Sequence, residues 1–248
     1  MTKVIAHRGA NRVAPQNTMP AFKIAKEMGA HGFENDVHMT ADGYIVVCHN
    51  YSIDETSDGS GLILEKTLEE LRQYDFGSYY SPEFAGTKIA TLDEFYELAR
   101  GLDIINVEIK PPLDRKFDIV NGVIDMAKEA GVFDNLLISS FDKEVLLKAH
   151  EYEPACKTAF LYDPNSPDIK IIAEDPVAYA KNLHADALHP VLFMVDEELV
   201  ENAHKNGMAV NPWTVNDPEA IDFFIGIGCD ALISDVPDFA LKKIMNED

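Results

Sequence analysis

Segments with the character of strands and of helices alternate along nearly the whole chain, and this alternation limits the folds open to it. Eight short runs combine β-branched and other apolar residues, as buried strands do. They are residues 3–7, 32–37, 103–110, 135–141, 157–162, 186–190, 208–215 and 230–235. Stretches with helical periodicity lie after them, at residues 18–30, 91–101, 116–132, 142–152, 175–185, 196–207, 217–228 and 236–245. Eight strands, each followed by a helix, predict an α/β fold of the (β/α)₈ TIM-barrel type.

The main competing architecture is a doubly wound open sheet. Such a sheet normally uses fewer strands and carries a glycine-rich phosphate-binding loop after the first one. Here the first strand runs into His7 and Arg8 instead. A length of 248 residues also suits a barrel. We therefore expect a single TIM-barrel domain over residues 1–248.

One interval interrupts the alternation. Residues 42–50 (DGYIVVCHN) are apolar enough to form a further extended segment after the second strand. Residues 51–90 then carry mixed helix and loop signals before the next helix begins. Long excursions after a barrel strand shape substrate pockets, so we interpret about 51–90 as a small insertion on the catalytic face.

The charge of the chain excludes some classes of partner. A formal net charge of −22 argues against a nucleic-acid-binding protein, which would carry a basic footprint. It also argues against electrostatic docking on anionic membranes. A small anionic ligand remains compatible with it, because charges beyond one Debye length, roughly 8 Å at physiological salt, are largely screened.

The cysteines and the N-terminal segment bear on location. Cys48, Cys156 and Cys229 are scattered and lack metal-ligand spacing, which predicts reduced core thiols and a cytoplasmic protein. A core strand at residues 3–7 leaves no room for a signal peptide ahead of it, and no apolar run approaches the roughly 20 residues of a membrane span. We expect no stable membrane association, and the sequence leaves the oligomeric state open.

Polar residues gather at the carboxyl ends of the predicted strands, where barrel enzymes place their chemistry. These residues are His7, Arg8, Glu34, Asp36, His49, Glu108, Lys110 and Trp213. Residues two apart in a strand point to the same face, so we expect Glu34 beside Asp36 and Glu108 beside Lys110. Asp235, two residues before Pro237, is interpreted as a helix cap. The remaining histidines are interpreted as structural or exposed: His31, His38, His150, His184, His189 and His204.

The chemistry that such a cluster supports is narrow. Three carboxylates without cysteine or clustered histidine are hard oxygen ligands that suit Mg²⁺ or Ca²⁺. An arginine and a lysine beside that cation indicate an anionic group, and phosphate fits best. Two histidines that titrate near neutral pH form a general acid and base pair. The combination predicts hydrolysis of a phosphodiester.

Several segments resemble the glycerophosphodiester phosphodiesterases. The resemblance is close in AHRGANRVAPQNTMPAF, GAHGFENDVHMTADGYIVVCHN and VEIK, and weaker in DGSG, TLDEF, PWTVN and ISDVP, so it spans nearly the whole chain. It implies a barrel with a small insertion after the second strand. It implies a divalent cation held by Glu34, Asp36 and Glu108, catalytic roles for His7 and His49, and phosphate binding by Arg8 and Lys110. Trp213 is then expected to wall the glycerol pocket. The substrate would be a small glycerophosphodiester, cleaved to an alcohol and glycerol 3-phosphate.

The chain departs from the family pattern at three positions. Gln16 stands where the family reads APENT, Asn50 where it often reads His-Asp, and Glu55 where an Arg-Thr pair often follows. Glu55 replaces a positive charge with a negative one, which bears on the choice of alcohol and fits a cationic one such as choline or ethanolamine. Two alternatives remain. One is a lysophospholipase D-like or other phosphodiesterase of the same superfamily, which would need an apolar rim. The other is a non-catalytic barrel that binds a phosphorylated ligand.

Overall fold

A computed structural model describes residues 1–245, and its central element is a parallel sheet rolled into a ring. The eight strands of the ring are β1 (Lys3–His7), β2 (Gly32–Met39), β5 (Ile104–Ile109), β6 (Leu136–Ser140), β7 (Lys157–Tyr162), β8 (Ala187–Pro190), β9 (Ala209–Val210) and β10 (Ala231–Ser234). Neighbouring strands follow the order β10-β1-β2-β5-β6-β7-β8-β9. Backbone hydrogen bonds from Asp230 to Val210 (3.0 Å) and from Ile233 to Pro212 (3.1 Å) close the ring between β10 and the segment at β9. The predicted TIM barrel is confirmed.

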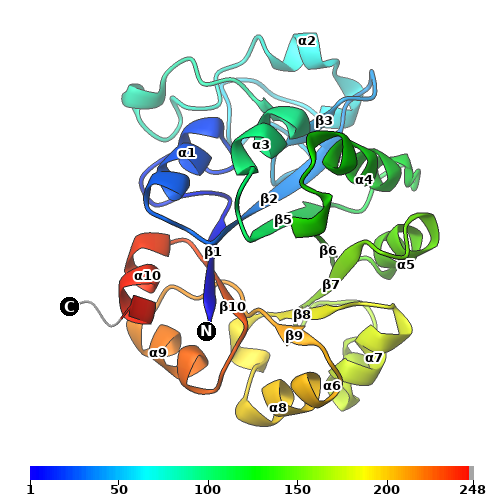
Figure 1. Ribbon diagram of the computed structural model, residues 1–248. Coiled ribbons are helices and arrows are strands. Elements are labelled where there is room, and N and C mark those ends of the chain that lie inside the picture. The colour runs from blue at the N-terminus through cyan, green and yellow to red at the C-terminus, as the bar shows by residue number, and fades with distance from the viewer. Residues whose placement is uncertain (246–248) are drawn as a thin grey trace.

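Helices surround this ring on its outside (Figure 1). They are α1 (Met19–Glu27), α3 (Leu92–Ala99), α4 (Asp118–Ala130), α5 (Lys143–Tyr152), α6 (Ile169–Glu174), α7 (Pro176–Asn182), α8 (Glu197–Lys205), α9 (Pro218–Gly226) and α10 (Pro237–Met245). All eight predicted helices are present, and the short α6 is an addition. Among the helices that the structure describes, none has the length and apolar character needed to cross a membrane.

Local sequence explains where several of these helices begin and end. Aspartate side chains accept backbone N–H groups at the start of α5, α7, α8 and α9, and thereby satisfy donors that have no partner within the helix. At the start of α3 the side chain of Glu94 accepts a hydrogen bond from the N–H group of Thr91 at 3.0 Å, which is one half of a capping box. Gly131, in the left-handed region at φ 70°, ends α4.

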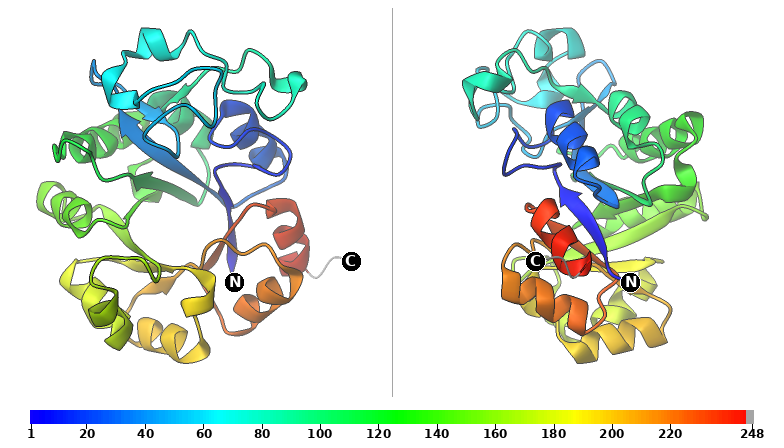
Figure 2. Two further views of the ribbon diagram at one scale, coloured as in Figure 1. Left: turned by 180° about the vertical axis from the view of Figure 1, so that it is seen from behind. Right: turned by 60° about the vertical axis from the view of Figure 1, so that its left-hand side comes forward.

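The insertion leaves the barrel after β2. β3 (Ile45–Val47) runs antiparallel to β2 and also pairs with β4 (Ala90–Thr91). Between them lie η1 (Ile63–Glu65), α2 (Leu68–Leu71) and η2 (Pro82–Phe84), which form the cyan lobe beside the barrel in Figures 1 and 2. The lobe has a small apolar core of its own: Val46, Cys48, Ile53, Ile63, Leu71, Phe76 and Ile89. Its irregular backbone is therefore held in place by burial.

Strand alternation divides the buried residues between two sides of the sheet. Phe33, Val37 and Ile105 pack outward against the helices with Phe22 and Phe95. Glu34 and Asp36 of β2, with Asn106 and Glu108 of β5, occupy the alternate positions and face the barrel interior, as the period of two requires. One strand is shorter than predicted: of residues 208–215, only Ala209–Val210 form the regular strand β9, although the N–H groups of Asn211 and Trp213 still donate to the carbonyls of Leu188 and Pro190 on β8.

Candidate active site

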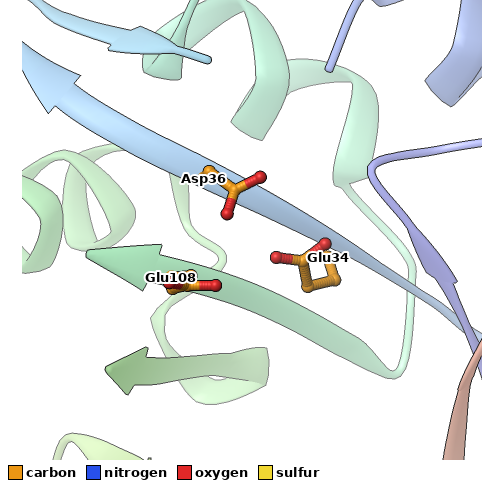
Figure 3. Close-up of side chains that lie close together, drawn as sticks. All are labelled: Glu34, Asp36 and Glu108. Carbon is orange, nitrogen blue, oxygen red and sulfur yellow. The ribbon is translucent and has the colours of Figure 1, made fainter. Parts of the chain in front are cut away.

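Three carboxylates meet at the carboxyl ends of β2 and β5. In the parallel pairing of these strands Asp36 lies opposite Glu108, and Glu34 lies opposite Asn106. One carboxylate oxygen from each of Glu34, Asp36 and Glu108 lies within 4.8 Å of the other two (Figure 3). All three side chains are buried. Strand periodicity therefore brings together the acidic residues that the sequence selected.

The electrostatics of the triad show that its carboxylates are costly to keep ionised together. Burial, with repulsion from Asp36 and Glu108, raises the pKa of Glu34 well above its ordinary value. Burial likewise raises the pKa of Glu108 to about 7, although Lys110 opposes the shift. The close approach of three buried carboxylates therefore disfavours the state in which all three are ionised. A bound divalent ion would remove this repulsion, and the all-oxygen donor set fits Mg²⁺ or Ca²⁺.

Two cationic side chains flank Asp36. Nζ of Lys110 lies 2.8 Å from Oδ1 of Asp36 and 2.5 Å from Oε1 of Glu108. Nε of Arg8 lies 3.3 Å from Oδ2 of Asp36. Burial opposes ionisation of Asp36, but Lys110 and Arg8 outweigh it and hold the pKa of this carboxyl far below its usual range. The amide of Asn17 also donates to Oδ2 of Asp36, at 2.7 Å.

The backbone after β1 is strained where it enters the site. Arg8 has φ 57°, in the left-handed region, which costs a residue other than glycine about 1–3 kcal/mol. Its N–H group donates to Oε2 of Glu34 at 3.0 Å, and its Nη1 donates to Oε1 of Gln16 at 2.7 Å. Gly9 follows at φ 80°, where a Cβ atom would lie 2.7 Å from the backbone of Ala21. The turn thus sets the guanidinium beside the triad at the expense of local strain.

His7 is oriented by a residue from the last strand. Its Nδ1 lies 2.7 Å from Oδ1 of Asp235, and its Nε2 lies 4.0 Å from Oε2 of Glu34. Asn11 and Asn216 also donate to the two oxygens of Asp235. Burial opposes ionisation of Asp235, but these hydrogen bonds and the charge of His7 hold its pKa well below the usual value. The ionised carboxylate only accepts, so Nδ1 of His7 carries a proton.

The interpretation of Asp235 as a helix cap is wrong. Both of its oxygens are engaged by His7, Asn11 and Asn216. Its place at the carboxyl end of β10, where barrel enzymes gather functional residues, is the signal that could have identified it. The contacts of Asn17 and Asn11 could not be predicted from the sequence, because both residues lie in the loop after β1 and have no periodic pattern.

His49 approaches the site from the insertion side. Its Nδ1 lies 2.7 Å from Oδ1 of Asn50. Burial lowers the pKa of His49 to about 4, and Lys110 and Arg8 add to this effect while Asp36 opposes it. Its backbone carbonyl accepts a hydrogen bond from Nε2 of His38 at 3.2 Å. His38 is therefore structural, as expected.

A cavity of about 130 Å³ opens where these residues meet. His7, Arg8, Glu34, His49, Glu108 and Lys110 form its polar lining, together with Asn106 and Ser139. Phe141, Leu161, Trp213 and Ile233 form an apolar side. The ring of Trp213 packs edge-on against Phe141 at 5.6 Å, and its Nε1 donates to the carbonyl of His189 at 2.8 Å. The structure thus brings together all eight residues that the sequence analysis selected, Asp36 through its contacts with Arg8 and Lys110.

The chain is similar in sequence to proteins of one family over nearly its whole length. The sequence profile described as the glycerophosphoryl diester phosphodiesterase family matches residues 7–239. A glycerophosphodiester phosphodiesterase of Caldanaerobacter subterraneus subsp. tengcongensis is 37% identical over 244 residues, which cover 98% of each chain. Another, of Bacillus altitudinis, is 32% identical over 246 residues, again covering 98% of each chain.

Solved structures resemble the fold over nearly its full length. A phosphodiesterase of Oleispira antarctica, in complex with the product sn-glycerol-3-phosphate, superposes with a TM-score of 0.90 at 29% identity and covers 99% of this chain and 97% of that one. A glycerophosphodiester phosphodiesterase of Thermotoga maritima gives a TM-score of 0.79 at 27% identity, with 98% of each chain covered.

Proposed function

The chain belongs to the glycerophosphoryl diester phosphodiesterase family, and from this premise we propose that it hydrolyses small glycerophosphodiesters to an alcohol and sn-glycerol 3-phosphate with the help of a divalent cation. One observation carries the proposal. A buried carboxylate triad, two cationic side chains and two histidines, drawn from four separate segments, line or adjoin one cavity. Hydrolysis of a phosphodiester needs groups that stabilise the negative charge of the phosphate and groups that transfer two protons, and this set provides both.

The cation would be held by Glu34, Asp36 and Glu108. When bound there, Mg²⁺ or Ca²⁺ would offset the charge that builds on the phosphate oxygens in the transition state. Burial, with repulsion among the carboxylates, raises the pKa of Glu34 and of Glu108, and a bound cation would offset this cost of holding them ionised together.

Arg8 and Lys110 would hold the phosphate. Both side chains already contact Asp36 and are only partly accessible, so their charges act at short range with little screening by solvent. The fork of Arg8 can offer two N–H groups to one phosphate, and Lys110 supplies a compact charge. Trp213 and Phe141 would enclose the carbon skeleton of the glycerol on the apolar side of the cavity.

The two histidines would move the protons. One would take a proton from the nucleophile, which is water or the neighbouring glycerol hydroxyl by way of a cyclic phosphate. The other would protonate the departing alcohol. Nδ1 of His7 is hydrogen-bonded to the Asp235 carboxylate, and Nδ1 of His49 is hydrogen-bonded to the Asn50 amide. Nε2 is therefore the nitrogen of each ring that is left for proton transfer.

A panel of diesters tests the proposal. Glycerophosphocholine, glycerophosphoethanolamine and glycerophosphoglycerol are each incubated with Mg²⁺, Ca²⁺ or Mn²⁺, and released glycerol 3-phosphate is measured. We expect turnover of at least one diester and no phosphate release from glycerol 3-phosphate itself. Absence of turnover on every diester with every cation would contradict the proposal. Lysophosphatidylcholine in the same panel tests the lysophospholipase D alternative, for which exposed Tyr79 and Tyr80 of the insertion offer the apolar rim.

A further inference from the structure

His49 is held through two consecutive hydrogen bonds. Its Nδ1 lies 2.7 Å from Oδ1 of Asn50, and Nδ2 of Asn50 donates to Oε2 of Glu55, also at 2.7 Å. Because Nδ1 faces Asn50, Nε2 is the nitrogen left for the cavity that His49 lines.

An asparagine beside a proton-transferring histidine creates an ambiguity. Its amide can present either an acceptor oxygen or a donor NH₂ group to the ring. If the NH₂ group of Asn50 faced His49, Nδ1 would have to accept and the proton of the neutral ring would lie on Nε2. The ring would then have no lone pair to offer the substrate. In serine proteases, replacing the aspartate beside the catalytic histidine by asparagine stabilises the wrong tautomer and lowers kcat by about 10⁴.

Glu55 removes this ambiguity. An ionised carboxylate only accepts hydrogen bonds, so the NH₂ group of Asn50 must turn toward Glu55. Oδ1 of Asn50 then faces His49, and Nδ1 of His49 must carry the proton. This tautomer is the one required in either role, because a base needs the lone pair on Nε2 and an acid leaves it there after giving up its proton.

The backbone fixes the place of Glu55 even though its side chain is exposed. Two residues before it, Ile53 is fully buried in the core of the insertion, and its N–H group donates to the carbonyl of Gly61 at 3.1 Å. Two residues after it, the hydroxyl of Ser57 donates to the carbonyl of Ile53 at 2.7 Å. The turn that carries Glu55 is thus anchored on both sides.

We infer that Asn50 and Glu55 are positioning residues that hold His49 in the tautomer protonated on Nδ1, with Glu55 acting by locking the orientation of the Asn50 amide. The inference rests on the proposed function, in which His49 transfers a proton. In this inference the negative charge of Glu55 orients Asn50 and thereby His49. It does not contact the alcohol part of the substrate.

A double-mutant cycle tests the inference. Glu55→Gln can donate to Oδ1 of Asn50 and so frees the amide to turn; we expect kcat to fall about threefold to tenfold, with KM and Tm little changed. In an Asn50→Asp background residue 50 has no NH₂ group to misdirect, so Glu55→Gln should change kcat by no more than about twofold. Glu65→Gln, an exposed glutamate of the same insertion, is the matched control. An equal loss from Glu55→Gln in both backgrounds would overturn the inference.

The tautomer can also be observed directly. In protein labelled with ¹⁵N-histidine, long-range ¹⁵N–¹H spectra should show a protonated, pyrrole-type Nδ1 for His49 in the wild type. Glu55→Gln should shift the His49 nitrogens toward a mixture of tautomers, and His49→Gln assigns the signals. A wild-type spectrum with the proton on Nε2 would contradict the inference without any assay of activity.

Failure of the proposed function has a different signature. If His49→Gln retains wild-type turnover, His49 transfers no proton, whatever its tautomer. If Glu55→Gln lowers turnover of glycerophosphocholine but spares glycerophosphoglycerol, Glu55 contacts the alcohol and the positioning role is wrong. An equal factor on both diesters, together with loss of activity in His49→Gln, supports the inference.

Discussion

Nδ1 of His7 lies 2.7 Å from Oδ1 of Asp235, although 228 residues separate them along the chain. The contact joins the first strand of the barrel to the last, since β1 pairs with β10 along Lys3–Ala6. It also places a partly buried negative charge behind the ring whose other nitrogen faces the cavity. The structure therefore shows that Asp235 orients the ring of His7 across the closure of the barrel.

The first prediction concerns this pair. Asp235→Asn keeps the size of the side chain but turns an acceptor into a possible donor toward His7, and it places a second amide beside Asn11 and Asn216. We expect kcat to fall by about 10²-fold or more, with a smaller change in KM. Asp222→Asn, which removes a surface ion pair with Lys243, is the control and should leave kcat unchanged. Steady-state assays check both variants, and an unchanged kcat in Asp235→Asn would exclude a positioning role.

The second prediction concerns the two histidines. His7→Gln and His49→Gln each remove a proton carrier from the cavity, so we expect turnover to fall by about 10²- to 10⁴-fold. Circular dichroism and thermal unfolding should show that both variants remain folded. A variant that retains near wild-type turnover would show that its histidine transfers no proton in the slow step.

Periodicity predicted much of the fold and of the site. The strand pattern gave all eight barrel strands, and the two-residue period placed Glu34, Asp36 and Glu108 on the same side of the sheet. Those inferences succeed because a barrel gathers the carboxyl ends of its strands at one face. Polar residues at strand ends are therefore predicted to lie close together even when they are far apart in the sequence.

The remaining parts of the site depend on tertiary closure and on irregular backbone. Asp235 reaches His7 only because β10 closes the ring against β1, and a strand-end aspartate shortly before a proline otherwise resembles a cap. Glu55 reaches Asn50 through a turn whose path is set by burial of Ile53. Neither contact has a periodic signature, so pattern analysis could not find it.

The third prediction concerns the cation. Removal of divalent ions with a chelator should abolish turnover, because Arg8 and Lys110 alone cannot balance three buried carboxylates and a phosphate. Added Mg²⁺ or Ca²⁺ should restore it. Activity is measured before chelation, after it and after addition of each ion. Full turnover in protein shown by elemental analysis to be metal-free would contradict the prediction that the triad holds a cation needed for turnover.

The fourth prediction concerns acid stability. Nε2 of His189, fully buried on β8, accepts a hydrogen bond from Asn211 at 2.9 Å, and burial lowers the pKa of His189 to about 3 from 6.5. Between about pH 3 and about pH 6.5, His189 binds a proton in the unfolded chain but not in the folded chain. The contribution of this residue to the free energy of unfolding is therefore fully present above about pH 6.5 and is lost as the pH falls. At about pH 5 this amounts to about 2 kcal/mol.

A His189→Gln variant measures that contribution. The glutamine keeps an acceptor for Asn211 but does not titrate. Its free energy of unfolding should fall less between about pH 7 and about pH 5 than that of the wild type, by about 2 kcal/mol, whatever the loss at neutral pH. Urea unfolding at both pH values gives the comparison. Identical pH dependence in the two proteins would mean that His189 is not buried in its neutral form.

The last prediction separates metal binding from phosphate binding on one strand and its loop. Glu108→Gln keeps shape but removes a negative ligand, so metal affinity should fall and excess cation should partly rescue turnover. Nζ of Lys110 lies 2.8 Å from Oδ1 of Asp36 and 2.5 Å from Oε1 of Glu108, two of the three carboxylates that would hold the cation. Lys110→Met should therefore leave metal affinity unchanged or raise it, because a competing positive charge is gone. Its loss should fall on turnover and on diester binding, and cation should not rescue it. Calorimetric titration of Mg²⁺ or Ca²⁺ into both variants, beside steady-state assays, distinguishes these outcomes; an equal loss of metal affinity in both would mean that Lys110 serves the cation site and not the phosphate.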